Sequence, residues 1–89
     1  MPRLSFTAHL ARVGPSDDVE VEAATVIEAL DRVFALYPRL ENYVLDDQRR
    51  LRRHVVIFVD GERAAADTVL ARPISAASEI YVLQALSGG

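Results

Sequence analysis

The sequence predicts an α+β fold in which one main helix packs on one face of a mixed sheet of four to five strands. Near the start of the chain, apolar and polar residues alternate, which is typical of half-buried strands. The apolar spacing then changes to three and four residues, which is typical of an amphipathic helix. Two unbroken apolar runs follow. Because a hairpin cannot bury its own apolar face, we expect the helix to lie across the sheet.

The first two strands are expected over residues 3–12 and 18–23, as a hairpin joined by turn residues at 14–17. In the second strand, Val19 and Val21 are expected to face inward. The apolar side of the first strand comprises Leu4, Phe6, Ala8 and Leu10.

The main helix is expected to begin after Thr25 and to end at Pro38. Thr25 and Glu28 have the spacing of a capping box, in which each side chain accepts a hydrogen bond from a free amide at the helix start. Pro38 lacks an amide hydrogen and disfavours helical geometry in the residue before it. The apolar stripe comprises Ile27, Leu30, Val33, Phe34 and Tyr37.

Residues 39–53 follow no single period, so we expect irregular structure with an exposed turn at 46–50. The residues expected to reach the core are Leu40, Tyr43, Val44 and Leu45. Residues 54–59 are β-branched or aromatic apart from the first, which predicts an interior strand that is apolar on both faces. Asp60-Gly61 predicts a tight turn, 64–78 a connection broken at Pro73, and 80–86 a last strand.

The composition limits the classes of function. The 89 residues are 51% hydrophobic and 26% charged, which indicates one globular domain. A net charge of -3 argues against general binding of nucleic-acid phosphates. The absence of cysteine removes disulfides and thiol nucleophiles. With no apolar run of about 18 residues and no signal-peptide pattern, we expect a cytoplasmic protein with no membrane partner.

The element order, ending in a strand and then Gly88-Gly89, resembles the ubiquitin-like β-grasp fold of the MoaD/ThiS group of bacterial sulfur carrier proteins. It looks most like the subset whose interior strand follows an arginine-rich turn, some of which serve cysteine synthesis. The sequence departs from the group at Ala77-Ser78, where members often carry Gly-Asp. The motifs that carry the resemblance are 56–62, Leu70, Pro73-Ile74, Glu79-Ile80 and 86–89.

The resemblance implies a β-grasp domain over residues 1–86 and a flexible diglycine tail over 87–89. It further implies that an E1-like adenylyltransferase and sulfurtransferase uses ATP and Mg²⁺ to adenylate the α-carboxylate of Gly89. Sulfur from a sulfide or persulfide donor then displaces AMP, and the thiocarboxylate donates sulfur to a synthase making molybdopterin, thiamine, cysteine or a related product. Gly88 and Gly89 are the working residues, because glycine permits close backbone approach in a narrow channel.

Two other functions stay open. The protein could be a modifier conjugated to target amines through Gly89, or a β-grasp interaction module with an inert tail. All ten basic residues are arginine, so the chain cannot form lysine-linked chains on itself, which favours sulfur transfer. We expect no catalytic residue, bound cofactor or metal in this chain, because it has no glycine-rich phosphate loop and no nucleophile elbow.

A sheet covered by one helix has a second face, which we expect to bind partner proteins. The residues expected there are Phe58, Tyr81 and Leu83, followed by Leu86, while Ile57, Val59, Ile80 and Val82 are expected under the helix. An exposed apolar patch with a charged rim is typical of a partner site.

A basic cluster formed by Arg49, Arg50, Arg52 and Arg53 stands beside His54. It is either a solvated turn balanced by Asp46 and Asp47, or a grip for an acidic partner surface or a phosphate. RNA binding is disfavoured because no aromatic residues alternate with the arginines. His9 and His54 are expected to be ordinary strand residues, since neither has a neighbouring ligand at metal spacing.

Overall fold

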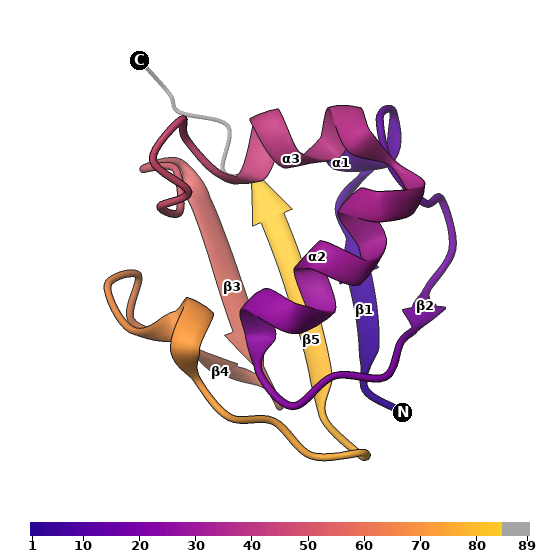
Figure 1. Ribbon diagram of the computed structural model, residues 1–89, viewed down its shortest axis with the longest axis vertical. Coiled ribbons are helices and arrows are strands. Elements are labelled where there is room, and N and C mark those ends of the chain that lie inside the picture. Colours follow the sequence, from indigo (N-terminus) through magenta and orange to yellow (C-terminus); the bar gives the residue numbers. More distant parts are fainter. Residues whose placement is uncertain (85–89) are drawn as a thin grey trace.

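The computed structural model of the protein describes residues 1–84, and it contains a five-stranded mixed sheet with helices packed on one face (Figure 1). The strands are β1 (Arg3–Phe6), β2 (Val19–Glu20), β3 (Val55–Val59), β4 (Glu62–Arg63) and β5 (Glu79–Gln84). Their order across the sheet is β2-β1-β5-β3-β4. The central β5 pairs parallel with β1 and antiparallel with β3. The predicted α+β β-grasp architecture is confirmed, and β3 is an interior strand as predicted.

Helix α2 (Val26–Leu36) lies across the sheet in Figure 1 and supplies most of the helical part of the core. The predicted capping box is present: Thr25 Oγ1 accepts from the amide of Glu28 at 3.3 Å, and Glu28 Oε1 accepts from the amide of Ala24 at 2.9 Å. The buried face of α2 differs slightly from the predicted apolar stripe: Ile27 is only half-buried and Tyr37 is exposed. Its buried residues are Val26, Ala29, Leu30, Val33 and Phe34.

A second helix, α3 (Pro38–Val44), follows α2 directly, where the sequence predicted irregular structure. Pro38 ends α2 and also begins α3. The first amides of a helix have no intrahelical acceptor, so proline, which has no amide hydrogen, loses no hydrogen bond at this position. The predicted core contacts of Leu40, Val44 and Leu45 are confirmed. The prediction for Tyr43 was wrong: its side chain is 42% exposed on the outer side of this short helix.

The N-terminal hairpin is antiparallel as predicted, but both strands are shorter and their connection is longer. β1 stops at Phe6; the amide of Thr7 still donates to the Val82 carbonyl at 3.1 Å, and helix α1 (Ala8–Ala11) follows. Leu10 is therefore buried from a helix and not from a strand. Only two residues of the segment 18–23 form β2, although the predicted inward position of Val21 is confirmed by its burial.

The predicted turn after β3 is confirmed, with φ of 53° at Asp60 and 85° at Gly61. Both residues occupy the left-handed region, which glycine adopts without strain. This turn creates the short β4, which the sequence reading did not anticipate. The connection at 64–78 contains the 3-10 helix η1 (Val69–Ala71), and Val69 anchors it in the core.

The turn that leads into β5 is closed by Ser78, a buried polar residue. The Ser78 hydroxyl accepts a hydrogen bond from the Ser75 amide at 2.9 Å, and the Ser75 carbonyl accepts one from the Ser78 amide at 3.1 Å. The Ser78 carbonyl then accepts from the amide of Arg3 at 3.0 Å. Serine therefore closes this turn where the resembling carriers often carry Gly-Asp.

Candidate functional site: the open sheet face and the exit of the C-terminal segment

The face of β3 and β5 turned away from α2 is open and apolar. Phe58 and Tyr81 lie opposite each other in the strand register. Tyr81 is 43% exposed, and Phe58 and Leu83 are half-buried. The residues predicted for the other face, Ile57, Val59, Ile80 and Val82, are all buried. The predicted division of these two strands between the faces is confirmed, whereas partner binding by the open face stays a prediction.

A shallow hollow of about 730 Å³ lies on this open face. Phe58, Tyr81 and Leu83 form its apolar part. Asp60, Gly61 and Glu79 line the rest of it. The amide of Asp60 donates to the Glu79 carbonyl at 2.8 Å, and Asp60 Oδ1 accepts from the Glu79 amide at 2.9 Å. The sequence did not predict this acidic rim, although Asp60-Gly61 predicted the turn that carries Asp60.

The last described residue of β5, Gln84, lies between β1 and β3. Gln84 lies opposite Val55, the first residue of β3. On the other side its amide donates to Thr7 Oγ1 at 3.4 Å. The remaining predicted site residues, Leu86, Gly88 and Gly89, lie outside the described residues. Five residues follow Gln84 in the sequence, and five extended residues can span at most about 17 Å.

The charge of the arginine-rich turn before β3 is partly neutralised, by one ion pair that was predicted and two that were not. Arg50 pairs with Asp46 at 3.5 Å, as predicted. Arg49 instead reaches two helices, pairing with Asp31 of α2 and with Glu41 of α3 at 2.7 Å. The hydrogen bond to Asp31 is the main cause that raises the pKa of the Arg49 guanidinium above its ordinary value. This pairing across 18 residues has no local sequence signal.

Asp46 organises the backbone of the same turn. Its Oδ1 accepts hydrogen bonds from the amides of Gln48 and Arg50, both at 2.9 Å. These bonds favour the carboxylate, and the one from Arg50 is the largest cause that lowers the pKa of Asp46 from its ordinary value of 3.8. Asp46 is therefore a structural residue of the turn.

Two arginines of the turn, Arg52 and Arg53, form no ion pair within the described residues. Arg52 Nε donates to the carbonyl of Asn42 at 2.6 Å, which fixes the side chain without neutralising it. Arg53 is exposed and, within residues 1–84, makes neither a side-chain hydrogen bond nor an ion pair. Both residues precede His54 and the start of β3, so they stand beside the point where the C-terminal segment leaves the sheet.

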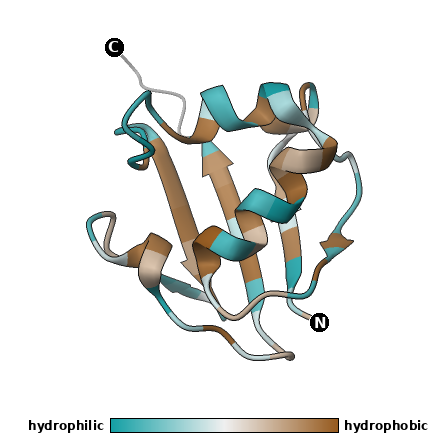
Figure 2. Ribbon diagram, viewed as in Figure 1, coloured by the Kyte–Doolittle hydropathy of each residue, from teal (hydrophilic) through white to brown (hydrophobic). Residues whose placement is uncertain are grey.

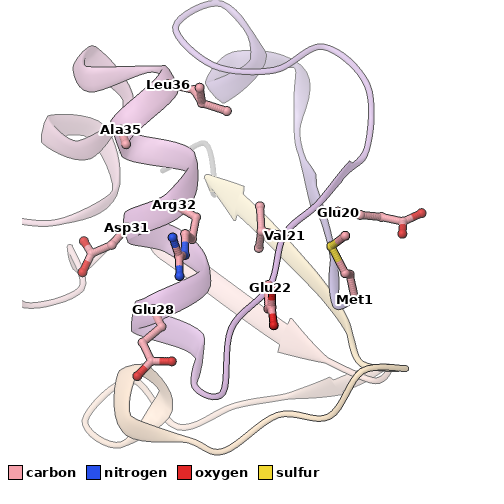
Figure 3. Close-up of a pocket in the computed structure, with 9 residues that line it drawn as sticks. All are labelled: Met1, Glu20, Val21, Glu22, Glu28, Asp31, Arg32, Ala35 and Leu36. Atoms are coloured by element: carbon pink, nitrogen blue, oxygen red, sulfur yellow. The ribbon is translucent and has the colours of Figure 1, made fainter.

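A second hollow, of about 710 Å³, lies between α2 and the segment around β2 (Figure 3). Arg32 of α2 and Val21 both line it, while Asp31 points away from Val21, toward its partner Arg49. Glu28 also lines the hollow, but its carboxylate is engaged by the helix cap. The charges around this hollow largely serve the fold.

Within the described part of the chain, three or more acidic or histidine side chains never gather closely enough to hold a metal ion. His9 lies on α1 and His54 just before β3, so the prediction that both are strand residues was wrong. No helix among residues 1–84 has the length and apolar character needed to cross a membrane.

No protein-family model matches the chain. Small archaeal modifier protein 1 of Haloferax volcanii is 35% identical over 85 residues, which cover 92% of this chain and 93% of that protein. The chain belongs to the small archaeal modifier protein 1 family. A crystal structure of the Haloferax volcanii protein matches with a TM-score of 0.80 and 33% identity, covering 99% of this chain and 98% of that one.

The family's ubiquitin-like β-grasp fold extends to more distant relatives. CysO, in a crystal structure of the BexX/CysO complex of Amycolatopsis orientalis, matches with a TM-score of 0.87 and 21% identity over the full length of both chains. The resemblance to ubiquitin-like carriers, including the subset linked to cysteine synthesis, is therefore confirmed at the level of fold. This small archaeal modifier homologue is of the modifier or sulfur-carrier kind.

Figure 2 shows how the hydropathy follows this architecture: the paired strands β3 and β5 are brown along most of their length. Teal residues concentrate on the outer side of the helices and in the turn before β3. Polar loops thus flank the apolar strands at the end of the sheet where β5 finishes.

Proposed function

We propose that this small archaeal modifier homologue is a sulfur carrier whose Gly89 carboxyl group is activated by an E1-like enzyme. The observation that supports this most directly is the open apolar face of β3 and β5, which extends along β5 to Leu83, six residues before Gly89. A partner that binds Phe58 and Tyr81 can therefore also receive the end of the chain. Gly89 has to be the terminal residue of the working protein, and the mass of the intact protein tests this.

The chemistry begins with a poor electrophile, because the charge of a carboxylate repels nucleophiles. In the first step a carboxylate oxygen of Gly89 attacks the α-phosphorus of ATP, and pyrophosphate leaves. In the second step a hydrosulfide ion attacks the acyl carbon, the bond between that carbon and the AMP oxygen breaks, and AMP leaves with the electron pair. The new thiol group loses its proton to solvent. The activating enzyme holds ATP and Mg²⁺, and a synthase then accepts the sulfur.

Conjugation to proteins is the second candidate function. Its support is the 35% identity to a protein named as a modifier, over nearly the whole of both chains. The same acyl-adenylate serves both functions, since an amine of a target can displace AMP in place of sulfide. The absence of lysine restricts this chain to the donor role.

The first test incubates the purified protein with the E1-like enzyme of the same genome, ATP, Mg²⁺ and sulfide. The expected result is release of pyrophosphate and a mass gain equal to the exchange of one oxygen for sulfur, located by fragmentation at Gly89. Adding target protein and finding glycine–lysine linkages supports the modifier function.

Deletion of Gly89 is the matched variant, because it leaves residues 1–84 unchanged. We expect pyrophosphate release to fall to background, with an unaltered unfolding curve. A deletion variant that releases pyrophosphate as fast as the full chain would contradict the role of Gly89. If deletion of Gly89 causes no loss in a growth or sulfur-transfer assay, the chain is an interaction module with an inert tail.

A further inference from the structure

The net charge of the chain is -3, but its basic and acidic residues are not evenly distributed along the sheet. Three segments meet where β5 ends, because Gln84 contacts Thr7 on one side and lies opposite Val55 on the other. These segments, residues 1–16, 48–59 and 80–89, contain no aspartate or glutamate. The basic residues that they place around this end of the sheet are His9, Arg12, Arg50, Arg52, Arg53 and His54. We call Arg12, Arg52 and Arg53 the exit arginines.

The charge of the exit arginines is not cancelled by the nearby carboxylates. Asp46 is engaged by Arg50, and Glu41 by Arg49. Within the described residues, none of the three exit arginines has a carboxylate oxygen within 4.0 Å. The remaining opposing charges are Asp47, exposed in the adjacent turn, and Asp17 and Asp18, exposed in the loop that follows Arg12. Arg52 and Arg53, on the β3 side of Gln84, therefore keep positive charge at this end of the sheet.

The opposite end of the open face is negative. Asp60 and Glu79 are joined by two hydrogen bonds, one from the Asp60 amide to the Glu79 carbonyl and one from the Glu79 amide to Asp60 Oδ1. Glu62 follows in β4, next to the exposed Arg63. Since the apolar side chains of Phe58 and Tyr81 lie between the two ends, the open face runs from an acidic rim, through an apolar centre, to a basic rim beside Gln84.

We propose that the exit arginines dock against an acidic rim around the entrance of the activating enzyme's site; this rests on the proposed function. The geometry requires contact at this place. Only five residues follow Gln84, and their maximum span of about 17 Å forces the end of the sheet against the enzyme when Gly89 is in its site. Complementary charge at such a rim mainly accelerates association and fixes the orientation of docking.

The test compares two charge reversals of equal size, Arg53→Glu at the basic rim and Arg63→Glu at the acidic end. Both arginines are exposed, and neither makes a side-chain hydrogen bond or ion pair within residues 1–84. The readout is kcat/KM for pyrophosphate release by the E1-like enzyme of the same genome, with thermal unfolding of each variant as the control for folding.

We expect R53E to lower kcat/KM about tenfold at low ionic strength, since steering of this kind changes on-rates by tenfold or more. The loss should shrink as salt screens the charges. R63E should equal or exceed the unaltered protein. R12E, on the other side of Gln84, should behave like R53E, and it replaces R53E if that variant is unfolded.

Equal losses in R53E and R63E, or no loss in R53E and R12E, would overturn this inference while pyrophosphate release by the unaltered protein still supported the proposed function. If the unaltered protein releases no pyrophosphate, the proposed function fails and the docking inference fails with it.

Discussion

Strands β3 and β5 place Ile57 and Val82 on one face of the sheet, and Phe58 and Tyr81 on the other. The first pair is almost completely buried, at 1% and 0% exposed, whereas Tyr81 keeps 43% of its surface accessible. Both pairs are apolar or aromatic, so composition does not distinguish the faces. The difference lies in what covers them: α2 lies over the first face, and no described element lies over the second. The same strands therefore contribute one face to the core and leave the other accessible.

Truncation of a residue on the covered face should have the largest effect on stability. Ile57→Ala removes buried methyl groups from a site that α2 prevents from collapsing freely. We expect the free energy of unfolding to fall by about 2–5 kcal/mol. Urea unfolding followed by circular dichroism measures this. A loss below that of Tyr81→Ala would contradict the assignment of the covered face.

The matched substitution on the open face, Tyr81→Ala, should cost much less. Its side chain loses the cross-strand pairs with Phe58 and Ser5, and each such pair contributes about 0.2–1 kcal/mol. We expect the same variant to weaken activation by the E1-like enzyme, because aromatic residues are frequent anchors in interfaces. Comparing unfolding with kcat/KM for pyrophosphate release separates the two effects. A variant with reduced stability and unchanged kcat/KM would indicate that Tyr81 serves only the fold.

The smallest expected effect belongs to the turn before β3, which lies on neither face. Because the pKa of Asp46 is lowered by folding, its carboxylate stabilises the folded state above the unfolded pKa, near 3.8, and this contribution is lost as pH falls through the folded pKa. Asp46→Asn should therefore be less stable than the unaltered protein at neutral pH. The difference should vanish in acid, as measured by urea unfolding across that range. If the difference in the free energy of unfolding were the same at every pH, the charge of Asp46 would not contribute to stability.

The sequence predicted those parts of the fold in which local chemistry and periodicity agree. Thr25 and Glu28 define the start of α2 through bonds within one helical turn, and the alternation in β3 and β5 divides the two faces correctly. Helix α3 was missed because Pro38 is compatible both with the end of one helix and with the start of the next. Helix α1 was missed because its four residues carry no helical period, and Ala8 and Leu10 also fit the alternation of a strand.

The site was predicted in part. Strand parity groups Phe58, Tyr81 and Leu83 on one face, but because both faces of β3 and β5 are apolar, only the structure shows that this is the face left open. The acidic and basic rims follow from which segments meet in three dimensions, and that depends on the parallel pairing of β1 with β5. The ion pairs of Arg49 likewise join residues that are distant in the chain. Charge patterns of this kind become readable only when the topology is known.

The position of β5 at the centre of the sheet also governs when the protein can begin to work. Its neighbours, β1 and β3, do not touch each other, so a nascent chain lacking β5 holds two separate fragments with unpaired edges. Formation of the sheet waits for contacts between the two extremes of the sequence, such as that of Gln84 with Thr7, and distant contacts of this kind slow folding. The scaffold therefore closes only after residues 79–84 have been synthesised, and a chain that stops before them cannot complete the sheet.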